Sequence, residues 1–113
     1  MKISFEEQNG VLRIFLSGEL DHHCTKNLME SIDALIDEYL PVCCVIDLKK
    51  LSFTDSSGVA VILRVNKKML SMKGGAQLEN VSGQPLRVFE AAGLHRLLQI
   101  YSKENEGAAY DNK

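Results

Sequence analysis

Four consecutive polar side chains, Thr54-Asp55-Ser56-Ser57, stand between an apolar stretch and a run with helical spacing. Asp, Ser and Thr are preferred N-caps, and one good cap stabilises a helix by about 1 kcal/mol. One of the four residues is therefore expected to cap the helix that follows. A single cap does not require four polar residues in a row, which leaves a hydroxyl group for another use.

One such use is phosphorylation. Gly58 follows the cluster in the first helical turn, where a residue without a side chain would let a partner approach a neighbouring serine closely. A phosphate at this place would be held by free helix amides and by the positive end of the helix dipole, and it would add roughly −1.5 to −2 charges. A serine that switches binding on and off is thus a physically reasonable interpretation.

A serine hydrolase is the alternative from a different class. The strand-turn-helix context suits a nucleophile, but the nucleophile elbow has the pattern G-x-S-x-G, and the sequence TDSSG lacks the leading glycine. A general base would have to come from the loop with His22 and His23, and a chain of 113 residues leaves little room for a substrate pocket. We therefore predict a protein that is not an enzyme and assign no catalytic residue.

The segment ELDHHC, residues 19–24, has a carboxylate, two imidazoles and a thiol in its last four consecutive residues. Adjacent side chains diverge, so at most two of them could face one metal ion, and no second Cys/His pair stands at ligand spacing. Asp-His-His also opens a motif of certain phosphoesterases, which need further acidic clusters for paired metals. A polar loop that enters a helix is the better interpretation, and no metal or cofactor is predicted.

Size and charge limit the possible partners. The chain has 113 residues, 45% of them hydrophobic, which suits one domain over 1–113, and its net charge of −2 gives no reason to expect nucleic acid or an anionic membrane. The cysteines, Cys24, Cys43 and Cys44, are odd in number, as expected for reduced thiols in the cytoplasm. No apolar stretch has the length of a signal peptide or a membrane span.

The first half of the chain has clear structural signals. Asn9-Gly10 predicts a tight turn between two antiparallel strands over residues 2–17. Apolar residues at helical spacing then predict a helix that begins near Thr25 and ends before Pro41. The continuous apolar run 42–48 predicts a central strand that is covered on both faces, with its two cysteines as small core residues.

The second half continues the alternation. The predicted elements are a helix from Val59 to about Leu70 ended by Gly74-Gly75, a strand over 76–81, a helix from Ser82 as N-cap to Gly93, and a strand over 97–102. We therefore predict an α/β fold with a small mixed β-sheet, an N-terminal antiparallel hairpin and helices packed against the sheet. Its core spans about residues 2–101, and 102–113 form a weak tail or short helix.

Two motifs resemble those of a known family. LSGELDHHC at 16–24 and LSFTDSSGVAVIL at 51–63 are similar to the G-E-L-D-H-H and D-S-S-G stretches of the anti-sigma factor antagonists of the STAS domain fold. The similarity is greatest to the sporulation type, which controls the forespore sigma factor F. The segment FEAAGL at 89–94 is similar to a helix end of the same family. The match covers about residues 10 to 100.

The resemblance implies a function. Members bind an anti-sigma factor that is itself a serine kinase with bound nucleotide, which makes it release its sigma factor; phosphorylation by that kinase switches the antagonist off, and a serine phosphatase reverses it. By position, Ser56 would be the acceptor, Ser57 the helix-capping hydroxyl, and Asp21 an acidic residue near the acceptor; Asp55 and Gly58 complete the expected binding residues. This chain has Ala60 where sporulation-type members tend to carry glycine. A STAS module that senses a nucleotide or another ligand is the alternative within the same fold.

Overall fold

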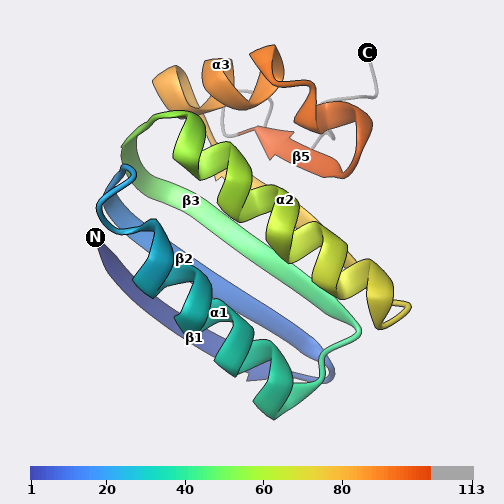
Figure 1. Ribbon diagram of the computed structural model, residues 1–113. Helices are drawn as coiled ribbons and strands as arrows, with labels where there is room; N and C mark the ends of the chain where they lie inside the picture. The colour runs from blue at the N-terminus through green and yellow to red at the C-terminus, as the bar shows by residue number, and fades with distance from the viewer. Residues whose placement is uncertain (103–113) are drawn as a thin grey trace.

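The computed structural model describes residues 1–102 as alternating strands and helices (Figure 1). In chain order the elements are β1 (Lys2–Gln8), β2 (Val11–Leu20), α1 (Thr25–Tyr39), β3 (Cys43–Thr54), α2 (Ser56–Ser71), β4 (Gly75–Val81), α3 (Gly83–Ala91), a 3-10 turn (Leu94–Arg96) and β5 (Gln99–Ser102). The predicted element order is confirmed. From residue 103 onwards, the predicted tail lies outside the residues that the structure describes.

The strands form one mixed sheet in the order β1-β2-β3-β4-β5. β1 is antiparallel to β2, and each later neighbour pair is parallel. The turn between the first two strands places Asn9 at φ 56° and Gly10 at φ 83°, the left-handed conformation that a two-residue hairpin requires. The predicted α/β fold with its antiparallel N-terminal hairpin is therefore confirmed.

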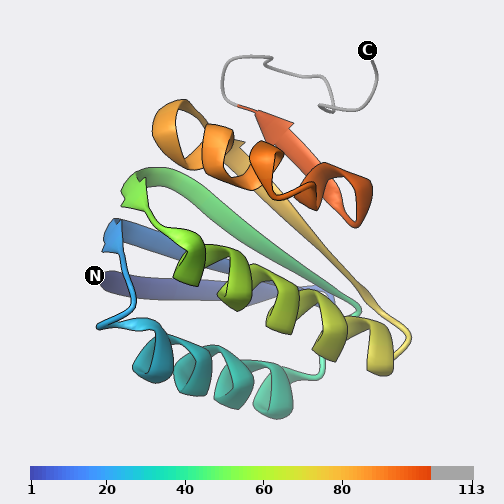
Figure 2. The same ribbon diagram turned by 45° about the horizontal axis from the view of Figure 1, so that its top comes forward.

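All three helices of the described chain lie on the same face of the sheet (Figures 1 and 2). Parallel strands that follow one another across the sheet in chain order are joined by crossovers of one hand, and these crossovers put their helices on one side. Helices therefore cover only one face of β3, but Val45 and Asp47 on its other face are only 2% and 8% exposed, so the predicted burial of this strand on both faces is confirmed. Cys44 points into the core with 0% exposure, whereas its neighbour Cys43 is only half-buried.

The core lies between this helical layer and the sheet. Every second residue of the inner strands points toward the helices, and each helix packs one apolar stripe against these residues. Side chains with no more than 2% exposure include Leu12, Ile14, Cys44, Ile46, Leu78, Ile32, Ile36, Ile62, Val65, Met69 and Phe89. One continuous core therefore joins all three helices to the sheet.

The central strand extends further than the sequence predicted. β3 runs to Thr54 because β2 continues to pair with it, as far as Leu20 opposite Thr54. β4 pairs with β3 only as far as Asp47, which lies opposite Glu79. The polar cluster therefore begins inside the sheet, on a strand end that has a strand neighbour on one side only.

The helix ends also differ in detail. α2 ends at Ser71, and Lys73, not a glycine, takes the left-handed conformation with φ 64°. Gly74 is needed for space, because a Cβ atom there would lie 2.7 Å from the Val42 carbonyl oxygen. Ser82 holds the predicted N-cap position of α3, although its side chain makes no capping bond. No helix within residues 1–102 is long and apolar enough to cross a membrane.

Candidate functional site at the junction of β3 and α2

Asp55 is the N-cap of α2. Its backbone is extended, and its carboxylate Oδ1 accepts a hydrogen bond of 2.8 Å from the Ser57 amide. A cap residue accepts from the second or third helical amide, and Ser57 is the second residue of the helix. The prediction that Ser57 supplies the capping hydroxyl is therefore wrong, because Ser57 already lies inside the helix.

The Asp55 carboxylate is also held by the loop at 19–24, which belongs to the motif LSGELDHHC. Desolvation acts to raise the pKa of Asp55, but hydrogen bonds from the Ser57 amide and hydroxyl, a hydrogen bond from the His22 amide and the charge of His22 outweigh it and lower the pKa. The charged form of the cap is thus favoured. The loop at 19–24 and the loop at 54–57 meet at this carboxylate.

Ser56 is the first residue of α2, and its side chain is exposed. The next two amides of the helix are bonded to Asp55: the Ser57 amide to its carboxylate at 2.8 Å and the Gly58 amide to its carbonyl at 3.0 Å. Among the hydrogen bonds within residues 1–102, none joins the Ser56 hydroxyl to a histidine ring. The residue is thus placed as an accessible hydroxyl at the positive end of a helix.

Thr54 is fully buried and connects the loop at 19–24 with the loop at 54–57. Its hydroxyl lies 3.2 Å from the Leu20 carbonyl oxygen and 3.1 Å from that of Asp55. The Asp55 amide donates to the same Leu20 oxygen at 3.3 Å. The backbone of the loop at 54–57, the Ser56 loop, is therefore held against the end of β2.

Gly58 lies beneath the loop and is buried. A Cβ atom at this position would be only 1.9 Å from the Thr54 hydroxyl oxygen. The structure thus gives Gly58 a different reason from the one predicted: the missing side chain leaves room for Thr54, and it does not uncover the backbone toward a partner. That Gly58 also takes part in partner binding stays a prediction.

Asp21 belongs to the turn that precedes α1. Its carboxylate accepts from the His23 amide at 3.0 Å, and its carbonyl accepts from the Cys24 amide at 3.2 Å. The structure brings the loop of Asp21 to the Ser56 loop, but the contacts are made by Leu20 and His22. Within the described residues no group of three or more His, Cys, Asp or Glu side chains is arranged to hold a metal ion.

Sequence reasoning missed Gln84. This side chain, from the first turn of α3, bonds both the amide and the carbonyl of Thr54, at 3.0 and 2.8 Å. No motif marks the residue, since a glutamine near a helix start is common and its partner is thirty positions away in the chain. Only the arrangement of β4 and α3 beside β3 reveals it.

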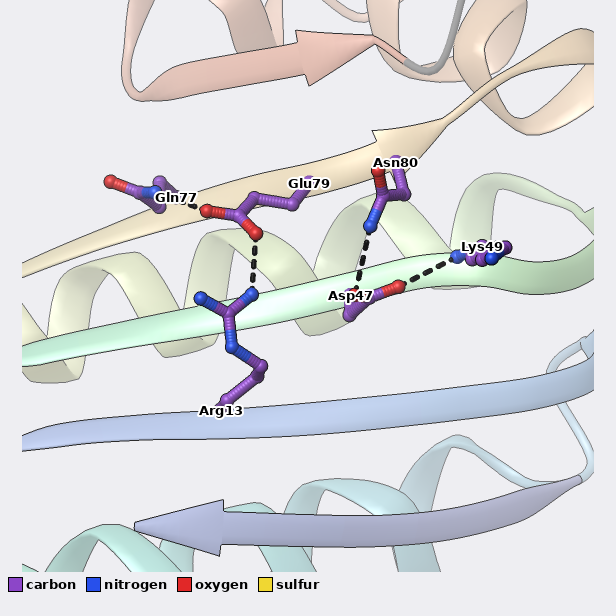
Figure 3. Close-up of polar contacts among 6 residues, drawn as sticks. All are labelled: Arg13, Asp47, Lys49, Gln77, Glu79 and Asn80. Carbon is purple, nitrogen blue, oxygen red and sulfur yellow. Dashed lines mark hydrogen bonds and ion pairs between the residues drawn. The ribbon is translucent and has the colours of Figure 1, made fainter. Parts of the chain in front are cut away.

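A second polar group lies on the opposite face of the sheet, away from the helices (Figure 3). Arg13 forms an ion pair with Glu79, which also accepts from Gln77 at 2.8 Å, and Asp47 accepts from Asn80 at 2.9 Å. The hydrogen bond to Glu79, opposed by desolvation, raises the pKa of Arg13. These contacts join β2, β3 and β4, and they do not involve the Ser56 loop.

Comparison with known proteins agrees with this fold. The model of the STAS domain family matches residues 2–107. The chain therefore belongs to the STAS domain family.

Relatives within this family are antagonists of anti-sigma factors. The chain is 36% identical over 105 residues to the anti-sigma F factor antagonist of Paenibacillus polymyxa, covering 92% of this chain and 89% of that protein. It is similar to the solved structure of the anti-sigma factor antagonist SpoIIAA in its unphosphorylated form, with a TM-score of 0.77 and 28% identity over 91% of this chain and 90% of the other. The phosphorylated form of SpoIIAA, a Bacillus cell fate determinant, matches at a TM-score of 0.69 and 28% identity over 91% and 94%.

Proposed function

We propose that this protein is an anti-sigma factor antagonist of the sporulation type, which is a binding protein and not an enzyme. It binds an anti-sigma factor serine kinase, frees the sigma factor F for transcription, and is switched off by phosphorylation on Ser56. The observation that carries the proposal is the exposed Ser56 at the start of α2, where the loops of the two family motifs, at 19–24 and 54–57, meet. The chain that carries these motifs is 36% identical to an anti-sigma F factor antagonist.

The outer face of α2 supports a partner surface next to the acceptor. Ser56, Ala60, Leu63 and Lys67 lie four, three and four residues apart on one exposed face of the helix. Leu63 and Phe53 are each 40% exposed, so this surface offers apolar side chains that a partner could cover. We propose that these side chains, together with Asp21, Asp55 and Ser57, contact the kinase, while Gly58 shapes the loop from beneath.

The switch is a phosphoryl transfer. The Ser56 Oγ attacks the γ-phosphorus of ATP bound to the kinase, the bond from that phosphorus to the bridging oxygen breaks, ADP leaves, and the serine proton is released. A serine phosphatase reverses the mark by hydrolysis. This chain needs no cofactor of its own, because the nucleotide belongs to the kinase.

The phosphate is expected to act on binding and not on folding. The positive end of the α2 dipole favours an anion at Ser56. In the complex, the same charge would have to lose its water and would repel acidic groups of the partner. We place this exchange in the cytoplasm, without direct contact to nucleic acid or membrane.

The decisive experiment is intact-mass analysis after incubation with ATP and the cognate anti-sigma kinase. We expect a gain of one phosphate in the wild-type protein and in the control Ser57→Ala, and none in Ser56→Ala. Equal phosphorylation of Ser56→Ala would contradict the assignment. No gain in any variant would favour a STAS module that senses a ligand, and labelling by a serine-reactive phosphonate would favour a hydrolase.

The same variants test the consequence for binding. Ser56→Ala should bind the kinase as the wild-type protein does and should not be switched off, since only the acceptor hydroxyl is removed. Ser56→Asp should bind at least about tenfold more weakly, because a fixed negative charge enters the interface. Titration calorimetry with the unphosphorylated proteins measures both affinities.

A further inference from the structure

Gln84 makes two hydrogen bonds to a single backbone residue at the base of the Ser56 loop. Its Nε2 donates to the Thr54 carbonyl at 2.8 Å, and the Thr54 amide donates to its Oε1 at 3.0 Å. Thr54 is the last residue of β3 and directly precedes the N-cap Asp55. The side-chain amide of α3 thus holds the point at which the strand passes into the loop.

The reason for this contact lies in the unequal lengths of the neighbouring strands. β2 pairs with β3 as far as Thr54, whereas β4 pairs with it only as far as Asp47. On the side of β4 the last residues of β3 therefore have no neighbouring strand. A glutamine side chain carries the same N–H and C=O groups as a peptide, so Gln84 satisfies Thr54 as one residue of an adjacent strand would.

The path of the chain after β4 brings Gln84 to this place. The pairing of β4 with β5 shifts register between Glu79 and Val81, and Asn80 between them has φ 60°. Gly83, at φ 62°, then begins α3. These departures from regular geometry turn the chain across the end of β3.

We propose that Gln84 is a positioning residue for phosphorylation of Ser56, an inference that rests on the proposed function. Thr54 is held by Leu20 on one side and by Gln84 on the other, two residues before the acceptor. This double attachment fixes the backbone from which the Ser56 hydroxyl projects, and in-line phosphoryl transfer depends on the direction of that hydroxyl. Gln84 itself does not touch the transferred group.

The test compares two glutamines. Gln84→Met keeps the length of the side chain and removes both hydrogen bonds, and Gln77→Met is the matched control, because Gln77 bonds Glu79 on the opposite face of the sheet. We expect kcat for phosphorylation of Gln84→Met by the anti-sigma kinase to fall about tenfold, while KM stays within about twofold. A merely destabilised protein that is still folded would not show this separation.

A second measurement tests the two hydrogen bonds between Gln84 and Thr54 directly. Hydrogen exchange at the Thr54 amide should become at least about tenfold faster in Gln84→Met, while the Ile46 amide in the middle of β3 keeps its rate. Gln84→Asn, too short by one methylene to reach both groups, provides a second variant if Gln84→Met folds poorly. Wild-type kcat in these variants would overturn the positioning role, whereas a wild-type protein that the kinase does not phosphorylate would overturn the proposed function.

Discussion

At the scale of single residues, the site depends on which member of a polar cluster does which task. Asp55 caps α2, Thr54 is buried and ties the loop to Leu20, and Ser56 alone is left exposed with its hydroxyl unused by the helix. The structural requirement for a cap and the chemical requirement for an acceptor are thus met by different residues. Phosphorylation of Ser56 would leave the cap in place.

The cap predicts a pH dependence of stability. The pKa of Asp55 is lowered in the folded protein from its ordinary value of 3.8, so its contribution is complete above pH 3.8 and is lost as the pH falls through the lower folded pKa. Asp55→Asn keeps a good N-cap without this titration. We expect wild type to be the more stable protein at pH 7 and the difference to shrink toward pH 3, as measured by urea unfolding at both pH values. A constant difference between the two proteins would contradict the prediction.

At the scale of elements, the junction of β3 and α2 depends on close packing. The buried Thr54 hydroxyl occupies the space where a side chain at position 58 would begin, so the strand end and the first helical turn approach as closely as a glycine allows. The same closeness brings the Leu20 carbonyl, the Asp55 cap and the start of α2 together.

This packing predicts the effect of a single methyl group. Gly58→Ala should destabilise the protein by about 1–3 kcal/mol, because its Cβ atom would lie 1.9 Å from the Thr54 hydroxyl oxygen. Gly75→Ala is the matched control, since no atom lies within 4 Å of the added Cβ atom there. Urea unfolding of both variants measures the difference.

The origin of the effect can be tested in a double mutant. In Thr54→Ala with Gly58→Ala the closest atom is gone, and the combined loss should be smaller than the sum of the single losses by at least about 0.5 kcal/mol. Strict additivity would show that the strain at position 58 has another source.

At the scale of the whole molecule, the sheet has one face packed under helices and one face that carries polar residues within the described chain. The Ser56 loop lies at an end of this layered structure, where it is attached to β2, to α3 and to the first loop. SpoIIAA has solved structures in both phosphorylation states, and this chain matches both with TM-scores above 0.5. The fold of this chain is thus similar to both the unphosphorylated and the phosphorylated form of that protein.

We therefore predict that phosphorylation leaves the fold intact. The melting temperature should change by less than about 5 °C, the shift expected for roughly 1 kcal/mol in a domain of this size. In amide NMR spectra, large shifts should be confined to residues near the site, at 20–24, 53–60 and Gln84. Large shifts throughout α1 or β1 would show instead that the phosphate rearranges the domain.

Much of the fold was predictable because its signals are local. Asn9-Gly10 gives the hairpin, helical spacing of apolar residues gives the helices, and Gly93 ends the third one with φ 77°. That helices cover only one face of β3 was not predictable, because a continuous apolar run does not say whether helices or other side chains bury each face. Asp47, for example, is 8% exposed on the face without helices.

The sequence by itself determined the elements, the family motifs and the exposed serine as a candidate, since each depends on residue types at short spacing. Only the tertiary structure decided that Asp55 is the cap, that Gly58 makes room for Thr54, and that Gln84 completes the hydrogen bonding at the end of β3. These contacts join groups from β2, β3 and α3 whose distance in space depends on strand pairing and strand length, which no local pattern specifies.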